Sequence, residues 1–272
     1  MSGDPFPTIT ALVVTYHTGP RLHECLYALK GDPDVTEIII VDNGNPPEER
    51  EWLDRFAAKT TGVSLLRDGT NPGYGAAVNR AAAVAMGEMF LVCNPDCVIK
   101  RGAMGPLVEA WRSAPAPAIV GGRIFDLHGV EERGARRNTL TLWNAVGLGK
   151  WALNREPPPE GPVRVGAVSG AFLLVHRADF ERLGGFDAGY FLHVEDVDLC
   201  RRALEASGSV TYQPLAGALH YGQTSDAPSA VVQAHKAAGL KRYFRKFPGG
   251  PLERIAAAIL VPLLGLALRF RG

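Results

Sequence analysis

The 272-residue chain is 46% hydrophobic, which is enough apolar content to bury a full core and excludes a disordered protein. Its formal net charge of +1 hides an asymmetry, because residues 236–272 hold eight basic residues and one acidic residue. That end carries +7 and leaves −6 on residues 1–235. An acidic body with a basic end argues against a nucleic-acid-binding protein and favours contact between that end and anionic lipid.

The first half of the chain alternates apolar runs with amphipathic stripes. Ile9–Thr15 and residues 37–41 have the β-branched composition of strands buried on both faces. Between them, the apolar side chains of Leu22, Cys25, Leu26 and Leu29 follow the spacing of one helix face, which predicts a βαβ unit.

The pattern then repeats. A helix around Trp52 and Phe56 precedes a strand at Val63–Leu66, and a helix over 75–86 precedes a strand at Met89–Cys93. This alternation predicts a doubly wound α/β sheet whose ligands lie at the carboxyl ends of the strands.

The second half is less regular. Residues 133–165 include three consecutive prolines and predict an irregular loop or lid. A strand over 170–175 and a helix over 177–183 precede an acidic segment, a helix over 199–206 and a strand over 209–213. We expect one domain over residues 1–228 and a basic, apolar helical extension over 229–272.

The extension divides at residues 248–251, and residues 255–268 are almost continuously apolar. Fourteen such residues are too few to span a bilayer, which needs about 20. An interfacial helix on the inner face of the cell membrane fits better, and the alternative is a helix packed on the core or on a second subunit. Residues 1–10 lack the pattern of a secretory signal, and the four cysteines form no CxxC pair, so we expect a cytoplasmic protein with reduced thiols.

Polar residues follow the first strands at the predicted ligand edge. Thr15 and Tyr16 end the first strand, and Asp42 ends the second, where it could accept from the imide N–H of uracil or thymine or cap the next turn. The loop Asn71-Pro72-Gly73-Tyr74-Gly75 provides a tight turn and close backbone approach to a ligand. Asn79, one turn into the next helix, could point its amide at a nucleotide or face solvent.

The segment Asn94-Pro95-Asp96 suits a divalent cation, because Mg²⁺ binds through one or two carboxylates together with substrate phosphates. A diphosphate leaving group needs its charge neutralised, and a metal on Asp96 would do so. His220 could add a metal ligand or a diphosphate contact, although a lone histidine is often structural.

The acidic segment places Glu195, Asp196 and Asp198 within four residues, after an aromatic and glycine-rich stretch. Acids in a helix's first turn are stabilised by its exposed N–H groups, but acids beside buried rings indicate a cleft wall. Asp196 is positioned to act as the general base that activates a hydroxyl, Glu195 would support its charge state, and Asp198 would cap the helix.

Seven blocks in order resemble family 2 glycosyltransferases, over about residues 9–225. The blocks are Val13-Val14-Thr15-Tyr16, Val41-Asp42-Asn43-Gly44, Asn71-Pro72-Gly73-Tyr74-Gly75-Ala76-Ala77-Val78-Asn79, Asn94-Pro95-Asp96, Ser169-Gly170-Ala171-Phe172-Leu173-Leu174-Val175, Gly184-Gly185-Phe186-Asp187 and Glu195-Asp196-Val197-Asp198-Leu199-Cys200.

The resemblance implies a GT-A fold with a Rossmann-like, mixed but mainly parallel sheet, a nucleotide-sugar donor, Mg²⁺ or Mn²⁺, and inversion at the anomeric carbon. It carries Asp42 over as the base-recognition residue, Asp96 as the surviving acid of the DxD-type motif, Asp196 as the general base and His220 as a contact near the metal. The blocks look most like the rhamnosyltransferase-type branch of cell-envelope polysaccharide synthesis, which implies dTDP-rhamnose or a similar dTDP- or UDP-sugar and a glycan or lipid-diphosphate-linked acceptor. Two departures are Asn94 at the first DxD position and His17 after the Thr-Tyr pair.

Two other functions remain open at this point. A sugar nucleotidyltransferase would share the architecture and the metal, but residues 19–22 echo its glycine-rich loop only faintly. A non-catalytic sugar- or lipid-binding module would keep the carboxylates for structure. A homodimer through the C-terminal extension is also compatible with the sequence.

Overall fold

A computed structural model describes residues 5–222, 228–251, 253 and 255–260. The predicted strands β1 (Ile9–Thr15), β3 (Val63–Leu66) and β4 (Met89–Cys93) have the expected bounds, and β2 (Val35–Asp42) is longer by two residues at its start and one at its end. The helices between them are α1 (Arg21–Lys30), α2 (Pro47–Lys59) and α3 (Tyr74–Val84), and the four apolar residues of the predicted α1 stripe are buried.

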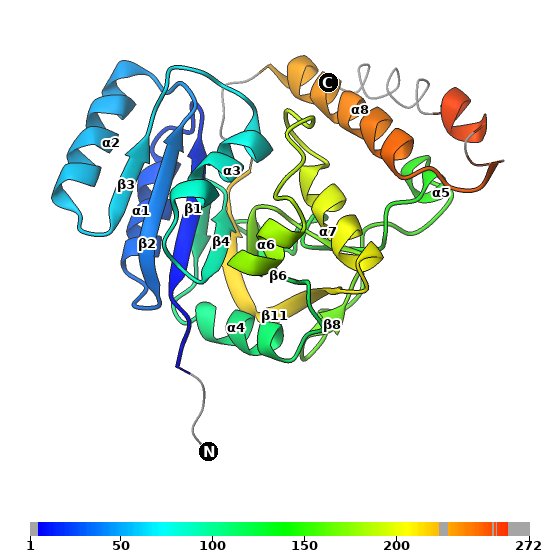
Figure 1. Ribbon diagram of the computed structural model, residues 1–272, viewed down its shortest axis with the longest axis horizontal. Helices are drawn as coiled ribbons and strands as arrows, with labels where there is room; N and C mark the ends of the chain where they lie inside the picture. Colours follow the sequence, from blue (N-terminus) through cyan, green and yellow to red (C-terminus); the bar gives the residue numbers. More distant parts are fainter. Residues whose placement is uncertain (1–4, 223–227, 252, 254, 261–272) are drawn as a thin grey trace.

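One mixed sheet forms the centre of the molecule, with helices on its faces (Figure 1). Its strand order is β3-β2-β1-β4-β10-β6-β11-β5. β3, β2, β1 and β4 are mutually parallel, whereas β10 runs antiparallel to both of its neighbours. The strands of the second half are β5 (Cys97–Ile99), β6 (Ala118–Phe125), β8 (Val163–Arg164), β10 (Phe172–His176) and β11 (Ser209–His220).

Three predictions for the second half need correction. The helix of the acidic segment, α7 (Glu195–Glu205), begins at Glu195 rather than at residue 199, so all three acids lie in its first turn. β11 continues beyond residue 213 to His220. Residues 133–165 are not wholly irregular, because β7 (Arg136–Arg137) pairs with β9 (Ala167–Val168), and a short helix, α5 (Leu142–Ala145), follows β7. The remaining helices are α4 (Met104–Arg112), α6 (Arg177–Arg182) and α8 (Ser229–Lys246).

The first helix of the C-terminal extension packs on the domain. Leu240, Tyr243 and Phe244 of α8 are buried in the same apolar cluster as the sheet. Arg242 and Lys246 bind the carboxylate of Asp187 at 2.7 and 2.8 Å, so part of the basic charge of the extension is neutralised inside the chain. The predicted apolar helix over 255–268 lies only partly within the described residues. No helix in the described ranges has both the length and the apolar content to cross a membrane.

Candidate active site

The carboxyl ends of β1 and β2 bring Thr15 and Asp42 together, as the sequence predicts. Asp42 is buried, and its carboxylate accepts from the backbone N–H groups of Gly44 (3.0 Å) and Asn45 (2.8 Å) and from Arg67 Nε (2.6 Å). Burial opposes the charged form, but these donors outweigh it and lower the pKa of Asp42. One carboxylate oxygen therefore holds the turn after β2 and the other binds Arg67 after β3, while contact with a nucleotide base remains a prediction.

Two neighbouring side chains at this edge, Tyr16 and Asn43, differ in exposure. Tyr16 is 40% exposed, and its ring lies beside Gly44. Asn43 donates to Asn71 Oδ1 at 3.2 Å, while its own Oδ1 is buried without a hydrogen-bond partner in the described structure. The flat, exposed Tyr16 ring suits a heterocyclic base, whereas the Asn43 oxygen is buried beneath the surface. Asn43 was visible in the sequence only as a neighbour of Asp42.

The loop at residues 71–75 and the start of α3 contact segments from the second half of the chain. Asn79 donates to the carbonyl oxygen of Phe186 at 2.7 Å and accepts from its N–H at 2.8 Å, so its amide does not face solvent. Tyr74 donates its hydroxyl to the carbonyl oxygen of Gly170 at 3.1 Å. Gly73 has a φ of +92°, and a Cβ atom there would lie 2.5 Å from the Phe191 carbonyl oxygen. These three residues connect the start of α3 to residues 170, 186 and 191 of the second half of the chain. Their contact with a donor remains a prediction.

The predicted metal-binding residues lie together at the ends of β4 and β11. His220 Nε2 lies 3.3 Å from Asp96 and 3.2 Å from the Asn94 amide, and its Nδ1 lies 2.8 Å from Glu132. Burial opposes the charged ring, but Asp96 and Glu132 outweigh it and raise the pKa of His220 to about 10. Glu132, which the sequence analysis missed, therefore fixes the orientation of this ring.

The donor set fits a divalent cation whose other ligands come from outside the protein. A carboxylate and an imidazole are usual ligands of Mn²⁺, and Mg²⁺ takes carboxylate, phosphate and water oxygens. Within the described ranges, no group of three or more His, Cys, Asp or Glu side chains is arranged to hold a metal alone. Asp96 and His220 would therefore share the ion with a diphosphate and water, and His220 would have to be neutral to ligate it.

The first turn of α7 gives its three acids different environments. Asp196 accepts from Arg137 at 2.7 Å and from the Gly170 N–H at 3.1 Å. Burial opposes its charge, but the Arg137 guanidinium and these hydrogen bonds lower its pKa. The lowered pKa keeps the carboxylate charged, and its side chain is 14% exposed.

The environment of Glu195, in contrast, favours its neutral, protonated form. It is buried beside Gly75, and its Oε2 has no hydrogen-bond partner in the described structure. Burial first, and then the charge of Asp196, raise the pKa of Glu195 to about 8. A neutral Glu195 leaves the negative charge of the pair on Asp196, and the supporting role of Glu195 stays a prediction.

Asp198 is structural, but it does not cap the helix as expected. Its carboxylate accepts from Tyr190 Oη (3.1 Å), Arg202 Nε (2.6 Å) and Lys246 Nζ (2.7 Å). These bonds tie α7 to the preceding turn and to α8.

A short backbone segment joins the metal side to the base side. The carbonyl oxygen of Ala171 accepts from the Asn94 N–H at 3.0 Å, and the adjacent Gly170 N–H donates to Asp196. The predicted cation ligands and the predicted base therefore flank two consecutive residues at the carboxyl edge of the sheet.

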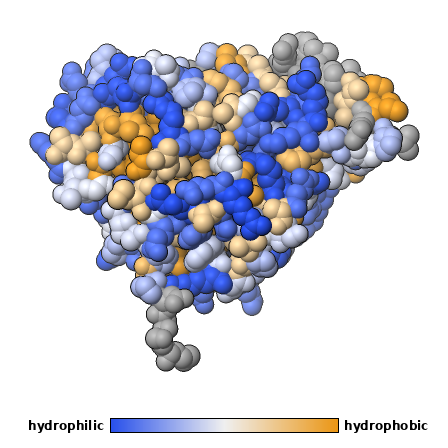
Figure 2. All heavy atoms as spheres, viewed as in Figure 1, coloured by the Kyte–Doolittle hydropathy of each residue, from blue (hydrophilic) through white to orange (hydrophobic). Residues whose placement is uncertain are grey.

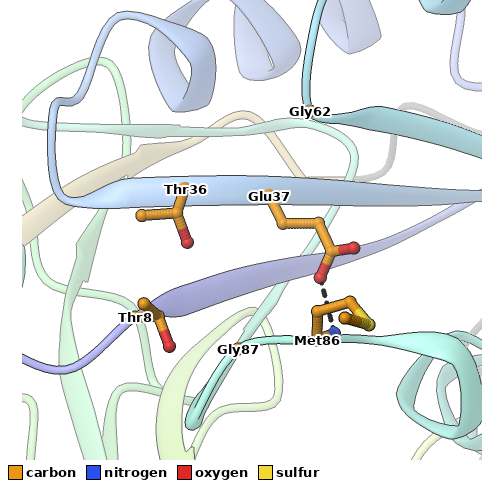
Figure 3. A pocket seen from close by; sticks show the side chains of 6 residues that line it. All are labelled: Thr8, Thr36, Glu37, Gly62, Met86 and Gly87. Carbon is orange, nitrogen blue, oxygen red and sulfur yellow. Dashed lines mark hydrogen bonds between the residues drawn. The ribbon is translucent and has the colours of Figure 1, made fainter.

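A shallow pocket of about 270 Å³ lies at the other edge, around the amino ends of β1 and β2 (Figure 3). Glu37 points across it and accepts from the Met86 N–H at 2.8 Å, and two threonines, Thr8 and Thr36, also line it. None of the predicted site residues lines this pocket, so it is separate from the candidate active site.

The fold and the side chains at its carboxyl edge define a glycosyltransferase of the GT-A type. A model of the family described as glycosyl transferase family 2 matches residues 10–184, and the chain belongs to this family.

Individual relatives agree with this assignment. N-acetylglucosaminyl-diphospho-decaprenol L-rhamnosyltransferase of Mycobacterium tuberculosis is 32% identical over 255 residues, which cover 84% of this chain and 81% of the relative. Rhamnosyltransferase WbbL of Escherichia coli is 47% identical over 224 residues, which cover 77% of this chain and 82% of the relative. The crystal structure of GalNAc-T7 with UDP, GalNAc and Mn²⁺ aligns with a TM-score of 0.70 at 17% identity, over 89% of this chain and 48% of that one, and shows the fold alone.

We expect Arg137→Ala to lower kcat about 100-fold, because Asp196 loses the group that orients it. The pKa of Asp196 should also rise without the cation, so the acid limb of the pH–kcat profile should move to higher pH. Steady-state kinetics should show partial rescue by Arg137→Lys and no effect of Arg164→Ala, which removes an exposed arginine on β8. A uniform loss of activity without a shift of the profile would limit Arg137 to a structural role.

We expect Glu195→Gln to change how stability depends on pH. The folded chain holds a proton on Glu195 between its usual pKa of 4.5 and about 8, whereas the unfolded chain releases it. The wild-type free energy of unfolding therefore loses a contribution as the pH rises through this range. In urea denaturation, the variant should gain stability relative to wild type from pH 5 to pH 8, with a constant gap above that. The exposed Glu205→Gln is the control, and a gap that does not widen would contradict the burial of an ionisable Glu195.

Proposed function

We propose that this chain is an inverting glycosyltransferase that moves a sugar from a nucleoside-diphosphate donor, dTDP-rhamnose or a similar dTDP- or UDP-sugar, to a hydroxyl of a lipid-diphosphate-linked or glycan acceptor. The observation that carries the proposal is the charged, partly exposed Asp196 beside the two-residue segment that leads to Asn94. The names of the two rhamnosyltransferase relatives support the donor sugar, and that of the mycobacterial relative supports the acceptor.

The chemistry follows from this arrangement. Asp196 accepts the proton of the acceptor hydroxyl, and that oxygen attacks the anomeric carbon from the face opposite the diphosphate. The bond between the anomeric carbon and the diphosphate oxygen breaks, and the nucleoside diphosphate leaves with both electrons, so the configuration inverts. A divalent cation bound near Asp96 and His220 would neutralise the charge that develops on the leaving group.

The nucleotidyltransferase alternative gains no support from residues 19–22. Arg21 forms an ion pair with Glu24 and lies over the ring of Tyr221, 4.0 Å from its centroid. This arginine is therefore engaged at the start of α1 rather than presented to a triphosphate.

The assay that tests the proposal measures nucleoside diphosphate release with Mn²⁺ or Mg²⁺, a panel of dTDP-, UDP- and GDP-sugars and a lipid-diphosphate-linked sugar. Asp196→Asn should lower kcat by about 100- to 10,000-fold, because it removes a general base. Asp96→Ala should remove the response to added metal. Glu109→Gln, an exposed acid on α4, is the control. Transfer at the wild-type rate by a folded Asp196→Asn protein would refute the base assignment.

We also propose that the chain works at the inner face of the cell membrane through its C-terminal extension. Ile255 and Ile259 are 63% and 60% exposed, and Figure 2 shows apolar surface at the upper right, where Figure 1 places this part of the chain. Since Arg242 and Lys246 already bind Asp187, attraction to lipid would come from the apolar residues and the remaining cations.

Liposome flotation tests this membrane proposal. A chain ending at Phe247 keeps α8 intact, and we expect it to bind anionic vesicles less well than the full chain. Equal binding would refute the proposal. If the full chain also sediments as a dimer and the shortened chain as a monomer, the extension is a subunit contact instead.

A further inference from the structure

The amino-terminal half of α8 lies against the turn that leads into the acidic segment. The rings of Phe191 and His235 are stacked with their centroids 4.3 Å apart. A Cβ atom at Gly239 would lie 3.0 Å from the His193 carbonyl oxygen, so the helix backbone touches this turn directly. Lys236 is three residues before Gly239 and four before the buried Leu240, which places it on the face of α8 that packs on the turn before α7.

This region is positively charged, and much of the charge is not neutralised. Burial first, and then the charges of Arg133 and Arg137, lower the pKa of Lys236. Arg137 is already bound to Asp196, but neither Lys236 nor the exposed Arg133 forms an ion pair in the described parts of the chain. By contrast, Arg242 and Lys246 at the other end of α8 are paired with carboxylates.

Cations that face one another without counter-charges destabilise a folded protein, and an anionic ligand relieves the repulsion. The nearby carboxylates do not fill this need, since Asp196 already accepts from Arg137 and Gly170, and burial favours the neutral form of Glu195. One more donor lies close by: the Trp151 indole N–H is buried without a partner in the described residues, and the ring faces Arg137 at 5.5 Å.

We propose that Lys236 of α8 and Arg133 of the β6–β7 connection bind the diphosphate of a lipid-diphosphate-linked acceptor sugar. This inference rests on the proposed function, because the base must meet a hydroxyl of that same sugar. The diphosphate is attached to the anomeric carbon of the acceptor sugar, so it must bind within about one sugar ring of Asp196. Lys236 lies one helical turn from Gly239, which touches His193 three residues before Asp196, and Arg133 lies four residues before Arg137, which binds Asp196.

The test compares two acceptors that carry the same sugar, a lipid diphosphate and an uncharged alkyl glycoside. Lys236→Ala and Arg133→Ala should each raise KM for the diphosphate acceptor about tenfold, the effect of one charge-assisted hydrogen bond. KM for the alkyl glycoside and for the donor should stay unchanged. Lys59→Ala on α2, an exposed helical lysine far from α8 in Figure 1, is the control. Equal effects on both acceptors, or no effect on either, would overturn the proposal.

A second measurement separates this inference from the proposed function. Calorimetry with inorganic pyrophosphate in metal-free buffer should show binding to the full wild-type chain and to Lys59→Ala, and about tenfold weaker binding to Lys236→Ala. If wild type transfers no sugar but this difference is present, the anion site stands and the proposed function fails. If wild type transfers sugar and pyrophosphate binds all three proteins equally, the site proposed for Lys236 is wrong.

Discussion

The presence of three carboxylates within four residues at the start of α7 is the constraint on which the rest of the site depends. Buried like charges cannot all remain ionised without partners. Burial keeps Glu195 protonated, Arg137 binds Asp196, and Arg202 and Lys246 bind Asp198. These partners come from two segments distant in the sequence, because Arg137 lies in β7 and Lys246 at the end of α8. The same ion pairs that stabilise the acids therefore fix β7 and α8 to the first turn of α7.

The turn before these acids is strained, which explains why so many contacts converge on it. His193 and Val194 have φ values of 68° and 75°, and a β-branched residue in this conformation costs about 1–3 kcal/mol. The turn persists because Tyr74 N–H donates to the Phe191 carbonyl oxygen and α8 packs on it at Gly239. Small residues on both sides, Gly73 and Gly239, allow the two backbones to approach closely. The turn leads directly into the first turn of α7, where Asp196 contacts Arg137 and Gly170.

The fold of the first half could be predicted because its signals are local. β1, β3 and β4 are short apolar runs with clear ends, and their bounds match the expectation. β6 is harder to predict from the sequence, because two glycines lie at its centre and glycine is more typical of turns. The reason is tertiary: Cβ atoms at Gly121 and Gly122 would lie 2.3 Å from Val168 and Phe172 side-chain atoms. For the site, the sequence supplied the strand-end residues, but not Arg137 or Glu132, whose partners lie 59 and 88 residues away in the chain.

Backbone groups of two consecutive residues connect the proposed base to the segment that holds the predicted metal ligand Asp96. Gly170 and Ala171 hydrogen-bond Asp196 on one side and Asn94 on the other, and both precede the buried strand β10. A Cβ atom at Gly170 would lie 3.2 Å from Asp196 Cβ, so this position has little room for a side chain. Because β10 pairs with both β4 and β6, the segment cannot shift without disturbing the centre of the sheet. The proposed base is therefore tied through this segment to a central strand of the sheet, a rigid support of the kind that a precisely positioned catalytic group needs.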